Sequence, residues 1–285
     1  MVLEHLFPED WLEKKFLYSF ILGAGYSIIS IIFAKILFPA DPALVAVAFT
    51  SLLLLPELYK LFSIEERIEK KEKKFGLKEL FKDNKSFVKI YVSIALGIFL
   101  VYALGAIFLP SFQVNQLFRE QLEMRGASGG AVFDQPLFWD ILINNWWVLL
   151  ACFLISLMTG DGAIFLITWN ASMWGTVFGV TARNAALFSN ANPFLYLILI
   201  LLIVLPHACL EILAYILGAI SGGVISKDVL LEKFESKRFN EVFKYNFWLF
   251  IIAIIILIIG ALIETGVLCN IDLYQQIITR SYMLG

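Results

Sequence analysis

The chain has little charge for its length. Charged residues make up 16 % of the 285 residues, whereas apolar residues make up 60 % and the mean hydropathy is +0.82. Soluble domains are about a quarter charged. This composition excludes a disordered chain, a nucleic-acid-binding module and an ordinary cytosolic enzyme.

Cysteine and histidine are also scarce. The three cysteines, Cys152, Cys209 and Cys269, fit neither a disulfide framework nor a zinc-binding spacing. The two histidines are His5 and His207, and catalytic zinc generally needs three protein ligands. We therefore expect no metal ion and no cofactor.

The chain does contain apolar runs of the length that crosses a bilayer, which requires about 20 residues of a helix. Seven segments qualify, over residues 16–38, 43–62, 87–109, 139–158, 163–180, 193–226 and 246–263. The sequence therefore predicts an all-α, polytopic helical protein of the cell membrane with about seven transmembrane helices.

The run over 193–226 is longer than one crossing requires. As a straight helix it would extend about 51 Å, against a hydrocarbon core of about 30 Å, so it either kinks and protrudes or breaks at Pro206 into two pieces. Loops on the cytoplasmic side carry an excess of Lys and Arg. If the run makes one net crossing, 17 of the 22 basic residues fall on one side. This sorting predicts a cytoplasmic N-terminus and a C-terminus outside.

Charge placement divides the chain into three parts. Residues 1–62 form an N-terminal arm and a transmembrane hairpin, and 63–86 form a charged cytoplasmic helix or loop. The remainder, 87–285, is a five-span membrane domain with an outside loop at 110–138 and a cytoplasmic loop at 227–246. The charged stretch is either a solvated helix or a docking surface, and the outside loop is where we expect an extracytoplasmic partner.

Two ionisable residues interrupt the longest apolar run. An ionisable side chain inside a membrane helix costs roughly 2.5–3.5 kcal/mol and marks a candidate functional site. His207 and Glu211 are four residues apart and share one helical face, which Gly218 and Gly222 continue. Pro206 frees a backbone carbonyl one turn earlier. Small residues on this face permit close helix packing.

Three interpretations of His207 and Glu211 remain open. The two side chains satisfy each other and nearby polar groups and fix the helix packing; or they bind an ion, a proton or a small substrate; or they are metal ligands of a membrane enzyme. The last lacks further ligands, because His5 lies in the N-terminal arm and no second histidine motif occurs in any span.

Other polar and small residues form a second layer. Asn144 and Asn145 lead into the fourth span, and Asn170 lies in the middle of the fifth. Small residues also recur at helical spacing, as Ser93, Gly97 and Gly105 in the third span and Ala171, Gly175 and Gly179 in the fifth. Together with the sixth span, these stripes predict a tightly packed core, with the first and last spans facing lipid.

These residues resemble a family signature. The segment from Pro206 to Glu211, followed by Ala214, Gly218-Ala219 and Gly222-Gly223, is similar to the Pro-His-Gly-x-x-Glu…Ala…Gly-Ala…Gly signature of the stage II sporulation protein M family. Ala208 stands where Gly is usual. The upstream pattern from Asn144 to Gly179 resembles the hairpin that precedes this signature, so the resemblance covers about residues 87–265.

The resemblance implies a non-catalytic integral membrane protein. In spore-forming bacteria the namesake is a membrane component of a cell-wall-degrading engulfment complex and recruits partner proteins. We therefore expect a scaffold or assembly subunit of a membrane complex that remodels the envelope. Its expected partners are the lipid bilayer, other membrane or envelope proteins and a second copy of the chain, but not nucleic acid. The alternative is a transporter or channel component with a polar site at His207 and Glu211.

Overall fold

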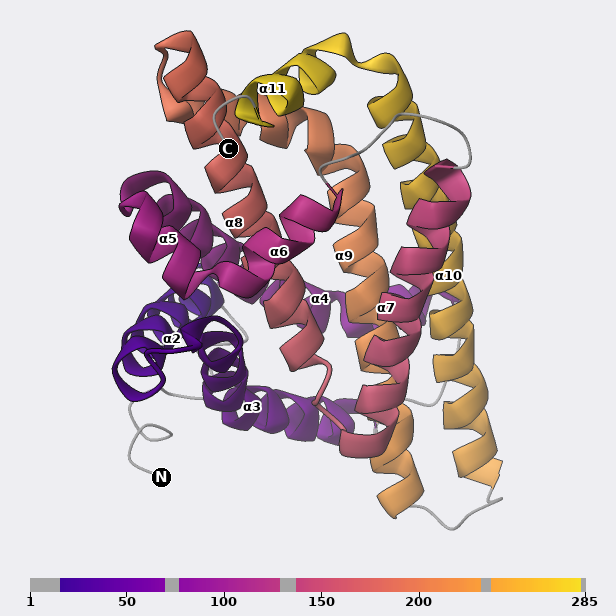
Figure 1. Cartoon of the computed structure of the whole chain (residues 1–285). Helices are drawn as coiled ribbons and strands as arrows, with labels where there is room; N and C mark the ends of the chain where they lie inside the picture. Colours follow the sequence, from indigo (N-terminus) through magenta and orange to yellow (C-terminus); the bar gives the residue numbers. More distant parts are fainter. Residues whose placement is uncertain (1–15, 70–76, 129–136, 232–236, 283–285) are drawn as a thin grey trace.

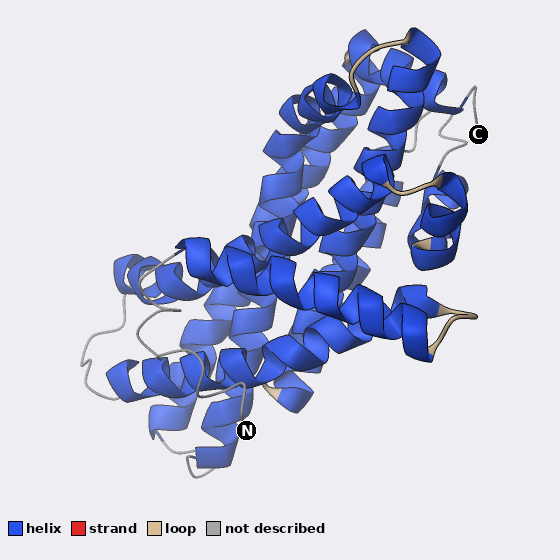
Figure 2. Ribbon diagram, turned by 90° about the vertical axis from the view of Figure 1, so that its left-hand side faces the viewer, coloured by secondary structure: helices blue, strands red, loops and turns tan. Residues whose placement is uncertain are grey.

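The structure is a computed structural model that describes residues 16–69, 77–128, 137–231 and 237–282. In these ranges every regular element is a helix: α2 (Phe16–Leu37), α3 (Pro42–Glu69), α4 (Leu77–Phe108), α5 (Ser111–Leu117), α6 (Arg119–Ser128), α7 (Leu137–Thr159), α8 (Ile164–Ser189), α9 (Pro193–Leu231), α10 (Lys237–Asn270) and α11 (Asp272–Tyr282). Figure 2 shows that the connections described between these helices are short loops. The predicted all-α class is confirmed for the described part of the chain.

Some predicted features fall outside the described residues. They are the N-terminal arm (1–15), the middle of the charged stretch (70–76), most of the second half of the outside loop (129–136) and part of the cytoplasmic loop (232–236).

Five helices are long and apolar enough to cross a membrane. They are α2, residues 84–108 of α4, α7, residues 193–226 of α9 and residues 239–270 of α10. The apolar part of α3 is shorter, over Pro42–Leu58. Helix α8 has 26 residues but carries polar side chains such as Asn170 and Arg183. Five of the seven predicted spans therefore meet this criterion in the described residues.

Helix α9 runs unbroken through Pro206. It is one helix of 39 residues, about 58 Å long at the usual rise per residue, so the 193–226 run does not break into two pieces. Pro206 lies on the exposed side of the helix, as does Leu202 one turn earlier. The ring and the carbonyl that it leaves without a helical donor thus face away from the bundle.

The long helices form a bundle with shorter helices across it. In Figure 1, α7, α8, α9 and α10 run lengthwise, α5 and α6 lie across the front, and α11 lies at one end beside α8. Helices α7, α9 and α10 contact one another. Helix α4 packs between α2 and α8, and α8 also contacts α9. The bundle therefore consists of two helix groups that meet along α8 and α9.

Glycines lie at close contacts between helices, and their spacing shows the direction of the helices. A Cβ on Gly175 of α8 would lie 2.5 Å from the carbonyl oxygen of Phe99 on α4, and one on Gly179 would lie 2.6 Å from that of Ala103. Contacts that advance by four residues on both helices mean that α4 and α8 run in the same direction. These two backbones approach closely because glycine has no side chain.

Helices α7 and α9 also run in the same direction. A Cβ on Gly218 would lie 2.6 Å from Leu149 Cδ1, and one on Gly222 would overlap the carbonyl oxygen of Phe153. The predicted small-residue stripe of α9 therefore packs on α7.

The sequence predicts that the first span faces lipid. One side of α2 instead packs against α4, so the prediction is wrong for that side. Gly97 of α4 packs against the backbone of α2 at Phe20, and Gly23 of α2 packs against the backbone of α4 at Ile94. The sequence stripe correctly marks α4 as a packing helix. Its partner is α2 because glycines on both helices allow a mutual close approach.

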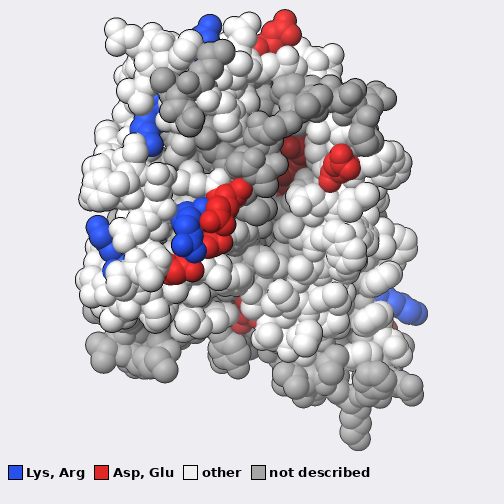
Figure 3. Space-filling view, in the orientation of Figure 1, with Lys and Arg blue, Asp and Glu red and all other residues white. Residues whose placement is uncertain are grey.

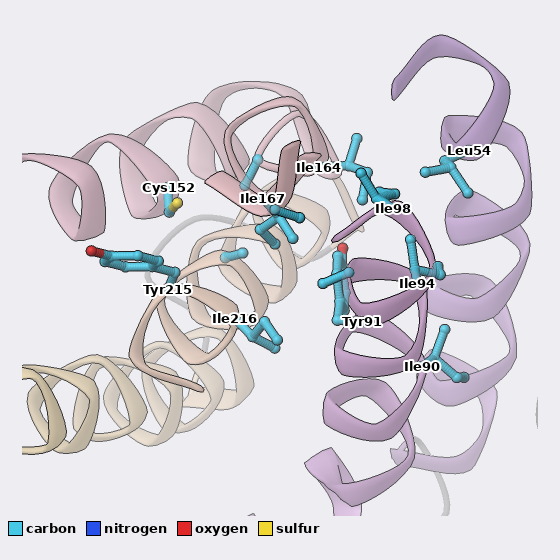
Figure 4. Close-up of a cluster of buried hydrophobic side chains, with 14 of the residues drawn as sticks. Leu54, Ile90, Tyr91, Ile94, Ile98, Cys152, Ile164, Ile167, Tyr215 and Ile216 are labelled. Carbon is cyan, nitrogen blue, oxygen red and sulfur yellow. The ribbon is translucent and has the colours of Figure 1, made fainter. Parts of the chain in front are cut away.

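Most of the buried apolar side chains form one large cluster across both groups, and a smaller cluster lies between α8, α9 and α11. Figure 4 shows Leu54 of α3 facing Ile94 and Ile98 of α4, with Ile164 of α8 beside them. All four side chains are at most 1 % exposed. Conversely, many large apolar side chains on α2, α7, α9 and α10 are exposed, which is the pattern of helices that face lipid hydrocarbon.

Candidate functional site

The polar site is built on α9. His207 and Glu211 are 5 % and 6 % exposed, and their spacing of one helical turn places them on the same face. Helix α10 passes close to this face, because a Cβ on Gly260 would lie 3.5 Å from Glu211 Cγ and 3.4 Å from Leu210 Cβ.

A second carboxyl from α10 meets Glu211. The side chain of Glu264 is hydrogen-bonded to that of Glu211. Sequence reasoning missed Glu264, because a glutamate directly after an apolar run is usual at a membrane surface. The available signal was its spacing of four residues from Gly260, which puts the carboxyl and a small residue on one face of α10.

Helix α7 supplies the third group. The side chain of Asn145 is buried and lies within interaction reach of Glu211, and Asn144 Nδ2 donates to Asn145 Oδ1 over 3.3 Å. The parallel packing explains this contact. Leu149 faces Gly218, so Asn145, one turn earlier, lies level with the turn of α9 that follows Glu211.

Two buried polar atoms in this part of the bundle have no hydrogen-bond partner among the described residues. They are Nδ1 of His207 and Oε1 of Glu211. A buried polar atom without a partner costs about 1–3 kcal/mol. Native proteins satisfy most such atoms, so His207 and Glu211 each keep unused hydrogen-bonding capacity in the described structure.

The other predicted site residues have different positions. Asn170 donates from Nδ2 to the carbonyl oxygen of Leu166 on its own helix, over 2.8 Å, and does not join the Glu211 cluster. Pro206 and Asn144 are exposed, and Gly218 and Gly222 pack against α7. The structure thus brings Asn145 to Glu211, while the glycines hold α7 in the register that allows this contact.

The composition of the site limits what it can bind. Among the described residues, no group of three or more His, Cys, Asp or Glu side chains could hold a metal ion. The site offers two carboxyls, an amide and an imidazole. Such a set suits a proton or hydrogen-bonded packing better than a tightly bound transition metal, which needs more convergent ligands.

The protein also has an open pocket at the α11 end of the bundle. Its volume is about 470 Å³, and it is lined by Phe188, Asp272, Gln275, Gln276, Thr279 and Arg280. This lining includes neither His207 nor Glu211, so the pocket and the intramembrane cluster are separate features.

A third feature is a platform that α5 and α6 form across the bundle. Arg119 lies 3.3 Å from Asp41 in the turn between α2 and α3 and also pairs with Glu120 and Glu123. In Figure 3, acidic and basic side chains gather over α6 on a face that otherwise carries few charges. This α5–α6 platform occupies the first part of the predicted outside loop.

Comparison with known proteins identifies the family. A search of curated proteins and a search of solved structures each gave no significant match. The family model for stage II sporulation protein M matches residues 16–267. This match extends beyond the resemblance seen in the sequence, because it also includes the first hairpin and the charged stretch. The chain therefore belongs to the stage II sporulation protein M family.

Proposed function

We propose that the chain is a non-enzymatic, multi-pass protein of the cell membrane that acts as a scaffold or assembly subunit of a membrane complex. The observation that supports this role is the fixed α5–α6 platform. Gln116 Nε2 donates to the carbonyl oxygen of Pro39 over 2.9 Å, and Gln121 Nε2 donates to Ser172 Oγ over 3.3 Å. The platform is thus attached both to the α2–α3 turn and to α8.

Apolar anchors hold the same platform. Val114, Leu117 and Phe118 are at most 4 % exposed, whereas Phe112 is 69 % exposed and Asn115 is also exposed. A short amphipathic segment with buried anchors and an exposed apolar side chain presents a preformed surface. Binding to such a surface avoids much of the entropy cost of ordering a loop.

We further propose seven crossings, with the N-terminus in the cytoplasm and the C-terminus outside. The helix directions support this count. Because α7 and α9 run in the same direction, the helix that joins them, α8, must return across the same thickness. Ser93 bonds to Phe16 and Gly97 contacts Phe20, so α2 and α4 also run in the same direction, and α3 must return between them.

The scaffold role is tested by crosslinking in native membranes. A photoreactive residue at Asn115 on the platform should give a discrete protein adduct, whereas one at Leu202, which is 66 % exposed on α9, should crosslink to lipid. Reversing the charge of Arg119 should reduce the adduct at Asn115. A platform that gives no protein adduct in native membranes would argue against an assembly role.

A transporter or channel component is the second candidate, and the carboxyl pair of Glu211 and Glu264 favours it. Ionisable groups within membrane helices line substrate and proton pathways in many transporters. Liposomes that contain the purified protein would then show ion or proton flux that Glu211→Gln abolishes. Equal leakage from liposomes with and without the protein would exclude this candidate.

A further inference from the structure

The carboxyl pair of α9 and α10 requires an explanation that a scaffold role does not give. An ionised carboxylate has hydrogen-bond acceptors only, so a direct hydrogen bond between two carboxyls requires a proton on one of them. Glu211 and Glu264 make such a bond. Such a contact between two carboxyls favours a state in which they share one proton.

The neighbours of the pair give no other way to compensate two negative charges. Asn145 of α7 contributes a neutral amide. No lysine or arginine of the described residues acts on either carboxyl. Two carboxylates at contact distance in a low-dielectric site repel strongly, and one of them normally retains its proton.

The titratable groups that face the pair come from three helices. On α9 they are His207 and Tyr215, and Tyr215 is only 2 % exposed and lies within electrostatic reach of both carboxyls. Cys152 of α7 lies beside Tyr215 (Figure 4). On α11, Tyr274 faces Glu264, and burial raises the pKa of Tyr274 to about 12. Tyr274 therefore stays neutral at physiological pH and adds no charge.

A second observation is that the site has hydrogen-bonding capacity that the described residues leave unused. Oε1 of Glu211 is buried without a partner, and so is Nδ1 of His207, one turn earlier on the same helix face. Both side chains are more than nine-tenths buried. A site that gains and loses protons needs free hydrogen-bond acceptors near the bound proton. Each of these two atoms can accept either the proton itself or a hydrogen bond from a water molecule that delivers it.

We propose that Glu211 and Glu264 form an intramembrane proton-binding site that holds one exchangeable proton between α9 and α10. Glu264 is the less buried of the two carboxyls and lies near the α10–α11 junction, so the proton exchanges through Glu264. When the proton leaves for solvent, the net charge of the pair changes from −1 to −2. The two carboxylates then repel, and the contact between α9 and α10 at Gly260 weakens.

This inference goes beyond the scaffold role and does not depend on it. If the α5–α6 platform binds no partner, the proton site is unaffected. A proton site without flux in liposomes would still be a site that responds to pH, whereas the transporter candidate requires flux.

The test is infrared difference spectroscopy of the full chain in lipid nanodiscs, in H2O and in D2O. At neutral pH the wild-type protein should show the C=O stretch of a protonated carboxyl that shifts in D2O. Both Glu211→Gln and Glu264→Gln should lose this band. Glu241→Gln is the matched control, because Glu241 is an exposed carboxyl on the same helix as Glu264, and it should keep the band.

Three results would overturn the proposal. The first is the absence of the band in the wild-type protein at neutral pH. The second is a band that persists in both Glu211→Gln and Glu264→Gln. The third is a band that sodium chloride removes and potassium chloride does not, which would identify a cation site. If the glutamine variants do not fold, the wild-type protein still decides the question. Its band should disappear in a single one-proton step as the pH rises, and a band that is insensitive to pH would refute the proposal.

Discussion

Glu264 on α10 meets Glu211 on α9 one turn beyond the close contact at Gly260, and Asn145 on α7 lies beside the same Glu211. The three helices that contact one another in this half of the bundle thus each contribute one polar side chain to a single cluster. Because one carboxyl is shared by both contacts, the loss of either carboxyl leaves buried polar groups without partners.

The first prediction concerns this coupling. Glu211→Leu and Glu264→Leu should each lower the free energy of unfolding by about 1–3 kcal/mol, because each leaves the other carboxyl of the pair without its partner. The double variant should lose less than the sum, since it removes both polar groups together. Denaturant unfolding in detergent micelles measures all three, with Glu241→Leu as the exposed control. Strict additivity would show that the two carboxyls do not interact.

The second prediction concerns the contact between α7 and α9. Gly222→Ala places a Cβ against the backbone of Phe153, which cannot move aside as a flexible side chain can. We expect a loss of about 1–3 kcal/mol, typical of overpacking, measured as a lower thermal midpoint. Gly25→Ala is the control, because nothing lies within 4 Å of its Cβ, and alanine favours a helix by about 1 kcal/mol over glycine. A Gly222→Ala variant as stable as the Gly25→Ala variant would contradict the close packing.

The third prediction concerns orientation. In a variant with Cys152 and Cys209 replaced by alanine, Cys269 near the end of α10 is exposed and should react with a membrane-impermeant maleimide in intact cells. A cysteine introduced instead at Glu241, at the opposite end of α10, should react only after the membrane is permeabilised. The reverse pattern would place the C-terminus in the cytoplasm.

The fourth prediction concerns the α5–α6 platform. Arg119→Asp puts like charges at the contact with Asp41, which is 3.3 Å from Arg119 in the wild type. We expect faster hydrogen exchange in α5 and α6, and we expect the charge-swapped pair, Arg119→Asp with Asp41→Arg, to restore the slower exchange. Hydrogen exchange in the membrane-spanning helices should remain as in the wild type. Unchanged exchange in α5 and α6 would mean that contacts other than the Arg119–Asp41 pair hold the platform in place.

Much of this architecture follows from local patterns. The apolar runs predict the long helices because each backbone polar group in hydrocarbon must be bonded within the helix. The glycine stripes predict which helix faces approach closely, and Gly175, Gly179 and Gly222 do face the backbone of a neighbouring helix. The stripes do not identify the neighbour, because a small residue permits close approach by any helix that fits the groove.

The predicted polar site was only partly complete. His207 and Glu211 were recognised because an ionisable residue in the middle of an apolar run stands out. Asn170 has the same appearance in the sequence, yet its amide bonds to its own helix at Leu166. Side-chain amides and hydroxyls inside a membrane helix have this local option, and the sequence pattern is the same in either case.

From the sequence alone it follows that this is a helical membrane-type protein and that one helix carries a histidine and a glutamate on a face of small residues. Each of these is a property of composition or of spacing within one segment. The tertiary structure decided that Glu264, Glu211 and Asn145 meet, and that α5 and α6 attach to the α2–α3 turn. Those contacts depend on helix direction and register, which are set by packing between segments distant in the chain.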